Sequence, residues 1–227
     1  KANLKEKTRI AAVVKANGYG HGAAPIARMI EKKDYLWGFA AATIEEAAEL
    51  RRNGIQKPIL ILGYVFPEDY EELVRLDIRP TVFRLDMAKE LSAEAVRQQK
   101  EVSVHVKVDT GMSRIGFVDT KESVQDVCAI SKLPGIRMEG LFTHFAKSDE
   151  LDKAATEKQL ARYCAFREAC EAAGVKFQIH HFSNSAGIID LPEANLDMVR
   201  AGITVYGLYP SDEVKKELVP LRPAMEM

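Results

Sequence analysis

The sequence lacks the marks of several protein classes. Its cysteines, Cys128, Cys164 and Cys170, are odd in number and fit no zinc-binding spacing, so we expect small thiols in a reducing compartment. No apolar run approaches the roughly 18 residues of a membrane span, and no signal peptide opens the printed sequence. These absences predict a cytoplasmic domain with no metal site and no membrane contact.

The sequence also lacks an excess of positive or of negative residues. The 227 residues hold 32 Lys plus Arg against 33 Asp plus Glu, which gives a net charge of −1. That balance provides no electrostatic footprint for nucleic acid or for an anionic membrane, so nucleic acid is not an expected partner. Any anion site must therefore be local and built from a few residues.

Apolar runs typical of strands alternate with helix-like segments along the whole chain. No Pro-, Gly- or Ser-rich linker divides it, and its length is close to the roughly 250 residues typical of a β/α barrel. The runs predicted as strands are Ile10–Val14, Trp37–Ala40, Ile59–Leu62, Pro80–Phe83, Val102–Val108, Met138–Thr143, Phe177–Phe182 and Leu196–Val199. The segments predicted as helices are Ala23–Glu31, Ile44–Asn53, Glu68–Leu76, Met87–Gln99, Lys121–Lys132 and Ala154–Ala173. The second of these helices opens with Thr43-Ile44-Glu45-Glu46, a capping-box pattern.

Eight strands that alternate with helices predict a parallel sheet, and their number favours a closed (β/α)8 barrel of the TIM type. An open, doubly wound sheet is the alternative, but it usually carries fewer strands. No Gly-x-Gly-x-x-Gly follows the first run, as it would in a dinucleotide-binding sheet. In a barrel, chemistry takes place where strands end and the next loops begin. Five of the eight runs are followed by polar or glycine-rich clusters, at residues 15–22, 107–114, 143–145, 181–187 and 200–203.

Lys15 directly follows four apolar residues, Ala11–Val14, and precedes Gly18, Gly20 and Gly22. Judged by residue type alone, a lysine at a strand end is most often an exposed surface residue. At a barrel mouth, a partly desolvated lysine could instead attack a carbonyl group to form a Schiff base. The glycines would let the backbone bend closely around a ligand.

The segment Ala12-Val13-Val14-Lys15-Ala16-Asn17-Gly18-Tyr19-Gly20-His21-Gly22 closely resembles the cofactor-attachment motif of alanine racemases, which use pyridoxal 5′-phosphate (PLP). Stretches 107–116, 143–145, 184–187 and 198–207 also resemble motifs of that family, in the same order. The resemblance covers nearly the whole chain. It implies the N-terminal barrel domain of a PLP-dependent amino-acid racemase.

The resemblance implies roles for residues in the first half of the site. Lys15 would hold PLP as an internal aldimine and act as one catalytic base, and Tyr19 would hydrogen-bond the cofactor phosphate. Arg114 would contact the PLP phenolic oxygen and the substrate carboxylate, which a bidentate guanidinium suits. Without the family, Arg114 could be a surface residue paired with Asp119. Lys107 resembles a lysine that relatives often carry as a carbamate, an anion that could orient Arg114.

Residues near the end of the chain would hold the rest of the cofactor. Asn184, Ser185, Gly202 and Ile203 resemble the phosphate-binding loops, and barrels commonly bind phosphate after strands seven and eight. Arg200 would lie against the pyridine nitrogen. An arginine cannot accept a proton, so that nitrogen would stay unprotonated and the ring would stabilise a carbanion less.

Three histidines differ in what the sequence predicts for them. His144 would lie near the cofactor ring, and its strand-end position and family match place it among the catalytic residues. Without those two arguments, a lone histidine is more often a buried structural residue. His180 and His181 are adjacent on a strand, so they should point to opposite faces, and we assign neither a catalytic role.

The resemblance also implies a mechanism and a missing part. A substrate amine would displace Lys15 to form an external aldimine, and two bases on opposite faces would then move the Cα proton. Lys15 would be one base; in the family the other is a tyrosine from the C-terminal β domain of a second subunit. We expect residues 1–212 to form the PLP-binding barrel and residues 213–227 to be a linker and the first strand of a truncated C-terminal β domain. This fragment would then be nearly inactive, and the full-length protein would be a homodimer.

The predicted activity is the interconversion of L- and D-alanine, which supplies D-alanine for cell-wall peptidoglycan. A serine or broad-specificity racemase and a non-catalytic PLP-binding protein are the alternatives. A metal-dependent barrel hydrolase could also combine a carbamylated lysine with histidines at strand ends. It usually needs His-x-His after the first strand, where this sequence has Lys15.

Overall fold

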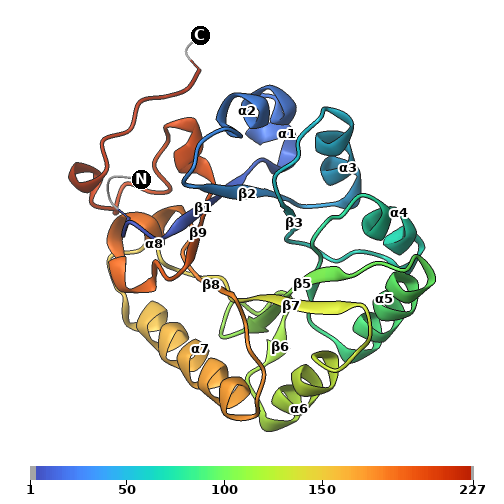
Figure 1. Cartoon of the computed structure of the whole chain (residues 1–227). Coiled ribbons are helices and arrows are strands. Elements are labelled where there is room, and N and C mark those ends of the chain that lie inside the picture. The colour runs from blue at the N-terminus through green and yellow to red at the C-terminus, as the bar shows by residue number, and fades with distance from the viewer. Residues whose placement is uncertain (1–3, 226–227) are drawn as a thin grey trace.

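In the computed structural model, which describes residues 4–225, eight parallel strands form a nearly closed barrel (Figure 1). The strands are β1 Arg9–Val13, β2 Leu36–Ala41, β3 Ile59–Ile61, β4 Thr81–Val82, β5 Val102–Asp109, β7 Ile136–Phe142, β8 Ile179–His181 and β9 Met198–Ala201. Their order is β3-β2-β1-β9-β8-β7-β5-β4, and the short β6, Phe117–Val118, pairs with β5 outside this ring. A parallel bridge between Leu60 and Arg79 joins β3 to the segment that leads into β4. The predicted (β/α)8 barrel is therefore confirmed.

The helices surround the barrel (Figure 1). They are α1 Lys15–Tyr19, α2 Ala23–Ile30, α3 Ile44–Arg52, α4 Tyr70–Arg75, α5 Leu85–Arg97, α6 Lys121–Ile130, α7 Ala154–Ala172 and α8 Ser185–Asp190. Short 3-10 helices are η1 Pro67–Asp69, η2 Pro192–Ala194, η3 Ile203–Tyr206 and η4 Lys216–Leu218. The sequence predicted α2 to α7 but not α1 or α8, because the clusters at residues 15–22 and 181–187 were assigned to loops that follow strands.

The start of α3 links a sequence pattern to the site. Thr43 accepts a hydrogen bond from the backbone N–H of Glu46 at 3.4 Å, as its predicted capping role requires. The reciprocal half of the capping box does not form. The Glu46 carboxylate instead accepts the backbone N–H groups of Ala16 and Ala42, both at 2.7 Å. Glu46 thereby fastens the loop after β1 to α3.

The barrel wall separates two buried regions. Outside it, alternate residues of β5, Val104, Val106 and Val108, belong to the apolar core beneath the helices. Inside it, one half is an apolar cluster formed by Ala11, Val13, Trp37, Ala40, Leu60 and Met198. The other half holds buried polar side chains, which are His105, Lys107, Glu139, His181 and Arg200. The interior therefore changes from apolar to polar across the barrel.

His180 and His181 point to opposite faces of β8, as predicted. The His180 ring lies 3.1 Å from the Tyr163 hydroxyl of α7, on the helix side, whereas His181 is fully buried and stacks on Phe142.

The segment after β9 contains η4 and, within residues 213–225, no strand. The backbone N–H of Ala224 donates to the Tyr206 carbonyl at 2.9 Å, so the segment returns to the barrel. The division at residue 212 stays a prediction. No helix in residues 4–225 is long and apolar enough to cross a membrane.

Candidate active site

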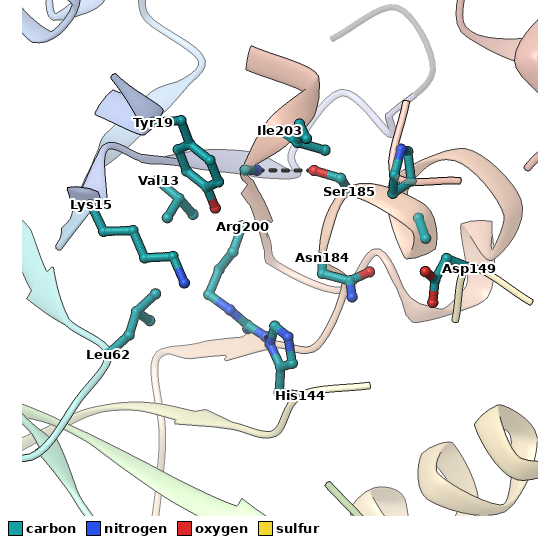
Figure 2. A pocket seen from close by; sticks show the side chains of 13 residues that line it. Val13, Lys15, Tyr19, Leu62, His144, Asp149, Asn184, Ser185, Arg200 and Ile203 are labelled. Carbon is teal, nitrogen blue, oxygen red and sulfur yellow. Dashed lines mark hydrogen bonds between the residues drawn. The ribbon is translucent and has the colours of Figure 1, made fainter. Parts of the chain in front are cut away.

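Two cavities, of about 220 Å³ and about 330 Å³, lie where the carboxyl ends of the strands meet. They adjoin, because Lys15, Leu62, His144 and Arg200 line both. The first cavity, drawn in Figure 2, is also lined by Tyr19, Asn184, Ser185, Gly202 and Ile203, and the second by Lys107 and Arg114. The structure thus brings together every site residue that the sequence predicted.

Lys15 follows β1 and projects its amine into the first cavity (Figure 2). The backbone after it is left-handed, with φ of 52° at Ala16 and 50° at Asn17. Such a conformation costs about 1 kcal/mol or more per non-glycine residue, so the turn needs support from its surroundings. The Asn17 side chain accepts the N–H of Ala23 at 2.9 Å, and Glu46 accepts that of Ala16. These bonds hold the strained turn that presents Lys15.

Tyr19 and Ser185 lie at one end of the first cavity (Figure 2), which Gly202 also lines. The Ser185 hydroxyl accepts the backbone N–H of Gly202 at 3.1 Å. A Cβ at position 202 would lie 3.1 Å from the Tyr19 hydroxyl, so a glycine keeps this end open. The Tyr19 ring packs 5.0 Å from the Tyr206 ring, whose hydroxyl donates to the Val13 carbonyl at 2.9 Å. Tyr206 thereby ties Tyr19 to β1.

Asn184 caps α8 and keeps a donor for the cavity. Its Oδ1 accepts the N–H of Gly187 at 3.0 Å and lies 2.9 Å from the Ser148 hydroxyl. Among the described residues its NH₂ group makes no hydrogen bond, and Asn184 lines the first cavity. The amide and the nearby hydroxyls of Tyr19 and Ser185 are donors of the kind that bind an anion.

Arg200 is 2% exposed and engages almost all of its donors within the protein. Its Nη1 donates to His181 Nδ1 at 2.8 Å, and its Nη2 donates to the Thr143 carbonyl at 2.7 Å and to His144 Nδ1 at 3.1 Å. Within residues 4–225 its Nε–H makes no hydrogen bond and remains available to a ligand. Burial, reinforced by the charge of Arg114, lowers the pKa of Arg200 to about 9. The guanidinium is therefore still cationic at neutral pH.

His144 is a neutral imidazole at pH 7. Its Nδ1 accepts from Arg200, so the proton is on Nε2. Burial, followed by the charges of Arg200 and Arg114, holds the pKa of His144 well below its usual range. The ring is suited to pack against a ligand and to donate one hydrogen bond.

Lys107 lies on β5 in the second cavity and is 2% exposed. Burial, followed by the charges of Arg114 and Arg200, lowers the pKa of Lys107 to about 7. Its Nζ lies 5.6 Å from the centre of the Phe142 ring. A large fraction of this lysine is therefore an uncharged amine at neutral pH.

Arg114 is positioned through its backbone. Asp109 accepts the N–H groups of Ser113 at 3.0 Å and of Arg114 at 3.2 Å. The surface pair between Arg114 and Asp119, considered from the sequence, is not formed, because Asp119 pairs with Arg162. The Arg114 side chain lines the second cavity instead.

The sequence analysis did not assign four residues to the site, although they shape or line it: Glu46, Asp109, Asp149 and Tyr206. Asp109 carried a usable signal, because an aspartate two residues before a glycine is typical of a turn closed by its own side chain. Glu46 was assigned to the capping box. Nothing local in the sequence relates Tyr206 to Tyr19, since 187 positions separate them.

The fold and the site together define a class of protein. It is a (β/α)8-barrel domain whose strand ends bring a lysine amine, a group of hydrogen-bond donors and two arginines together around two adjoining cavities. The family model for the alanine racemase N-terminal domain matches residues 1–210, and the chain belongs to that family.

Individual relatives agree with this assignment. The chain is 47% identical over 225 residues to the alanine racemase of Clostridium perfringens, covering 99% of this chain and 58% of that protein. It is 45% identical over 218 residues to the alanine racemase of Desulforamulus reducens, covering 96% and 59%. The solved structure of Clostridium difficile alanine racemase in complex with cycloserine has a TM-score of 0.97 at 45% identity, covering 98% of this chain and 61% of that one. The chain thus spans about three fifths of the length of these relatives.

Proposed function

We propose that this domain forms the cofactor site of a PLP-dependent racemase that interconverts L- and D-alanine. The observation that carries the proposal is the convergence of three groups on one cavity: the Lys15 amine, the free Nε–H of Arg200 and the anion-binding end. PLP carries an aldehyde, a pyridine nitrogen and a phosphate, which require such partners. The relatives named above are alanine racemases, which supports the same activity for the complete protein.

The donors around the first cavity fit PLP. Tyr19, Asn184, Ser185 and the backbone at Gly202–Ile203 would bind the phosphate. Arg200 would donate its Nε–H to the pyridine nitrogen. Because an arginine side chain has no hydrogen-bond acceptor, the nitrogen must be the acceptor and would stay unprotonated. When bound, PLP would withdraw electrons from the substrate and so acidify its Cα–H bond.

Proton transfer at Cα needs a group on each face. Lys15, whose amine projects into the cavity, would remove or return the proton on one face. We assign the other face to a tyrosine outside this chain, contributed by a second subunit of a homodimer. His144, being neutral, would hold the ring in place through packing and its Nε2–H and would not carry the proton.

Lys107 and Arg114 would position the substrate carboxylate. A neutral Lys107 amine can add CO₂, which forms an N–C bond and releases one proton to leave an anionic carbamate. That anion would accept hydrogen bonds from Arg114 and offset part of the positive charge shared by Lys107, Arg114 and Arg200. Arg114 would then face the carboxylate in a fixed orientation.

The product, D-alanine, would serve cell-wall peptidoglycan synthesis in the cytoplasm. The test is racemisation of L-alanine by the complete protein, with L-serine assayed in parallel and the products separated by chiral chromatography. Lys15→Arg keeps the charge but removes the reactive amine, so we expect activity to fall by about a thousandfold or more. Lys89→Arg, on α5 outside both cavities, is the control and should match the wild type.

Each other outcome points to a different protein. Faster turnover of serine than of alanine would change the substrate and keep the mechanism. PLP binding with no turnover of either amino acid by the complete protein would contradict the racemase proposal and leave a PLP-binding protein.

A further inference from the structure

A line of hydrogen bonds crosses the polar half of the barrel interior, from Arg200 to Glu139. Arg200 Nη1 lies 2.8 Å from His181 Nδ1, and His181 Nε2 lies 2.8 Å from His105 Nδ1. His105 Nε2 then lies 3.0 Å from a carboxylate oxygen of Glu139. His105 and His181 are fully buried and Glu139 is 6% exposed, so bulk solvent hardly reaches these bonds. We call these four residues the relay.

The chemistry at the two ends fixes the direction of every bond in the relay. An arginine only donates, so His181 Nδ1 must accept and its proton must be on Nε2. His181 Nε2–H then donates to His105 Nδ1, which places the His105 proton on Nε2. That proton is donated to Glu139, whose carboxylate only accepts. Both imidazoles are therefore neutral and each has a single allowed tautomer.

We propose that Glu139 is a positioning residue for Arg200 and acts through His105 and His181. The proposal rests on the proposed function, because the Nε–H that Arg200 keeps free is the group we direct at the pyridine nitrogen. If the carboxylate were absent, only the donor at the Arg200 end would still favour the His105 proton on Nε2. A proton on His105 Nδ1 would turn His181 around and place an N–H against the Nη1 donor of Arg200. The guanidinium would then lose one of the contacts that orient it.

The surroundings of Glu139 keep its carboxylate an acceptor. Arg79 lies 3.4 Å and Arg137 lies 3.2 Å from its oxygens. Burial alone would raise the pKa of Glu139, but the hydrogen bond from His105 and the two arginine charges outweigh it, so the pKa is lowered. The Trp37 ring packs edge-on to His105 at 5.4 Å and closes the side of the relay that faces the apolar half.

Nitrogen-15 NMR of the cofactor-free chain tests the relay without any ligand. The chain has five histidines, and long-range spectra distinguish the two neutral tautomers of each. We expect only the Nε2–H tautomer for His105 and His181 in the wild type, and a population of Nδ1–H at His181 in Glu139→Leu. His105→Leu breaks the same line without removing a charge, so it replaces Glu139→Leu if that variant does not fold. Thr81→Val is the control, since Thr81 is fully buried in β4 and its hydroxyl donates only to the Ile61 carbonyl, at 2.6 Å.

PLP titration then measures the consequence for Arg200. Loss of one oriented, charge-assisted contact predicts about tenfold weaker PLP binding in Glu139→Leu or His105→Leu and unchanged binding in Thr81→Val. An unchanged His181 tautomer in both folded relay variants, or equal PLP affinity in all variants, would overturn the proposal. A wild-type chain that shows the expected tautomers but binds no PLP, even when extended to the full length of its relatives, would overturn the proposed function and leave the relay supported.

Discussion

Lys107 offers the sharpest quantitative prediction, because its pKa is displaced so far. With a pKa of about 7 in place of 10.5, about half of the Lys107 amines are neutral at pH 7. An ordinary lysine is neutral in only roughly 0.03% of molecules at that pH, so the excess of reactive amine is about a thousandfold. CO₂ reacts with the neutral form alone. We therefore expect one lysine of this chain to carry a carbamate at neutral pH in bicarbonate buffer.

Carbon-13 NMR with labelled bicarbonate provides the assay. A single carbamate signal should appear in the wild type, persist in Lys153→Gln and disappear in Lys107→Gln. Lys153 is a fair control because it is also partly buried, at 21% side-chain exposure, but pairs with Asp190. A signal that survives Lys107→Gln, or no signal from the wild type at pH 8, would refute the reasoning.

The lowered pKa of Lys107 should also affect the free energy of unfolding. In CO₂-free buffer the unfolded chain keeps the Lys107 proton up to about pH 10.5, whereas the folded chain releases it near pH 7. The unfolded state thus binds more protons between these values, so the free energy of unfolding should gain a contribution that rises with pH there. Lys107→Met should remove that contribution, which urea unfolding at pH 7 and pH 9 would measure. An identical pH dependence in both proteins would contradict the assigned pKa.

Three further predictions concern other parts of the site. Gly202→Ala places a methyl group 3.1 Å from the Tyr19 hydroxyl, so PLP binding should weaken by about tenfold, and an unchanged dissociation constant would count against the assigned phosphate end. Asp109→Ala removes the acceptor for the Ser113 and Arg114 N–H groups, so amide hydrogen exchange across residues 111–114 should accelerate; unchanged protection would show that other contacts hold Arg114. The low pKa of His144 predicts no protonation between pH 6 and 8, and an NMR titration midpoint inside that range would be inconsistent with it.

The sequence predicted the barrel because its signals are local. Each long strand is an apolar run of a few residues, and α2 to α7 carry helical patterns, so the alternation was readable. The sequence did not predict β6, which lies in the loop after β5 and outside the ring, or α1 and α8, which begin inside clusters that were assigned to loops. The left-handed turn at Ala16 and Asn17 was also not predicted, because glycines rather than these residues were expected to bend the backbone.

The site residues also fall into a group that the sequence predicted and a group that it did not. Residues carried by motifs at strand ends, such as Lys15, Arg114 and Ser185, were predicted and lie together. The relay was not predicted, because it joins β5, β7, β8 and β9 and depends on which residues of parallel strands lie at one level inside the barrel. A shift of one residue in the strand register would turn the His105 side chain to the outside of the barrel. No local sequence pattern fixes the register between strands.

We propose above all that Lys15 holds PLP at the barrel mouth. The direct measurement is to add PLP to the purified chain, reduce with borohydride, digest, and locate the pyridoxyl group by mass spectrometry. We expect a label on Lys15, and none at that position in Lys15→Arg. A specific label on another lysine, or no label on a folded chain extended to the full length of its relatives, would contradict it.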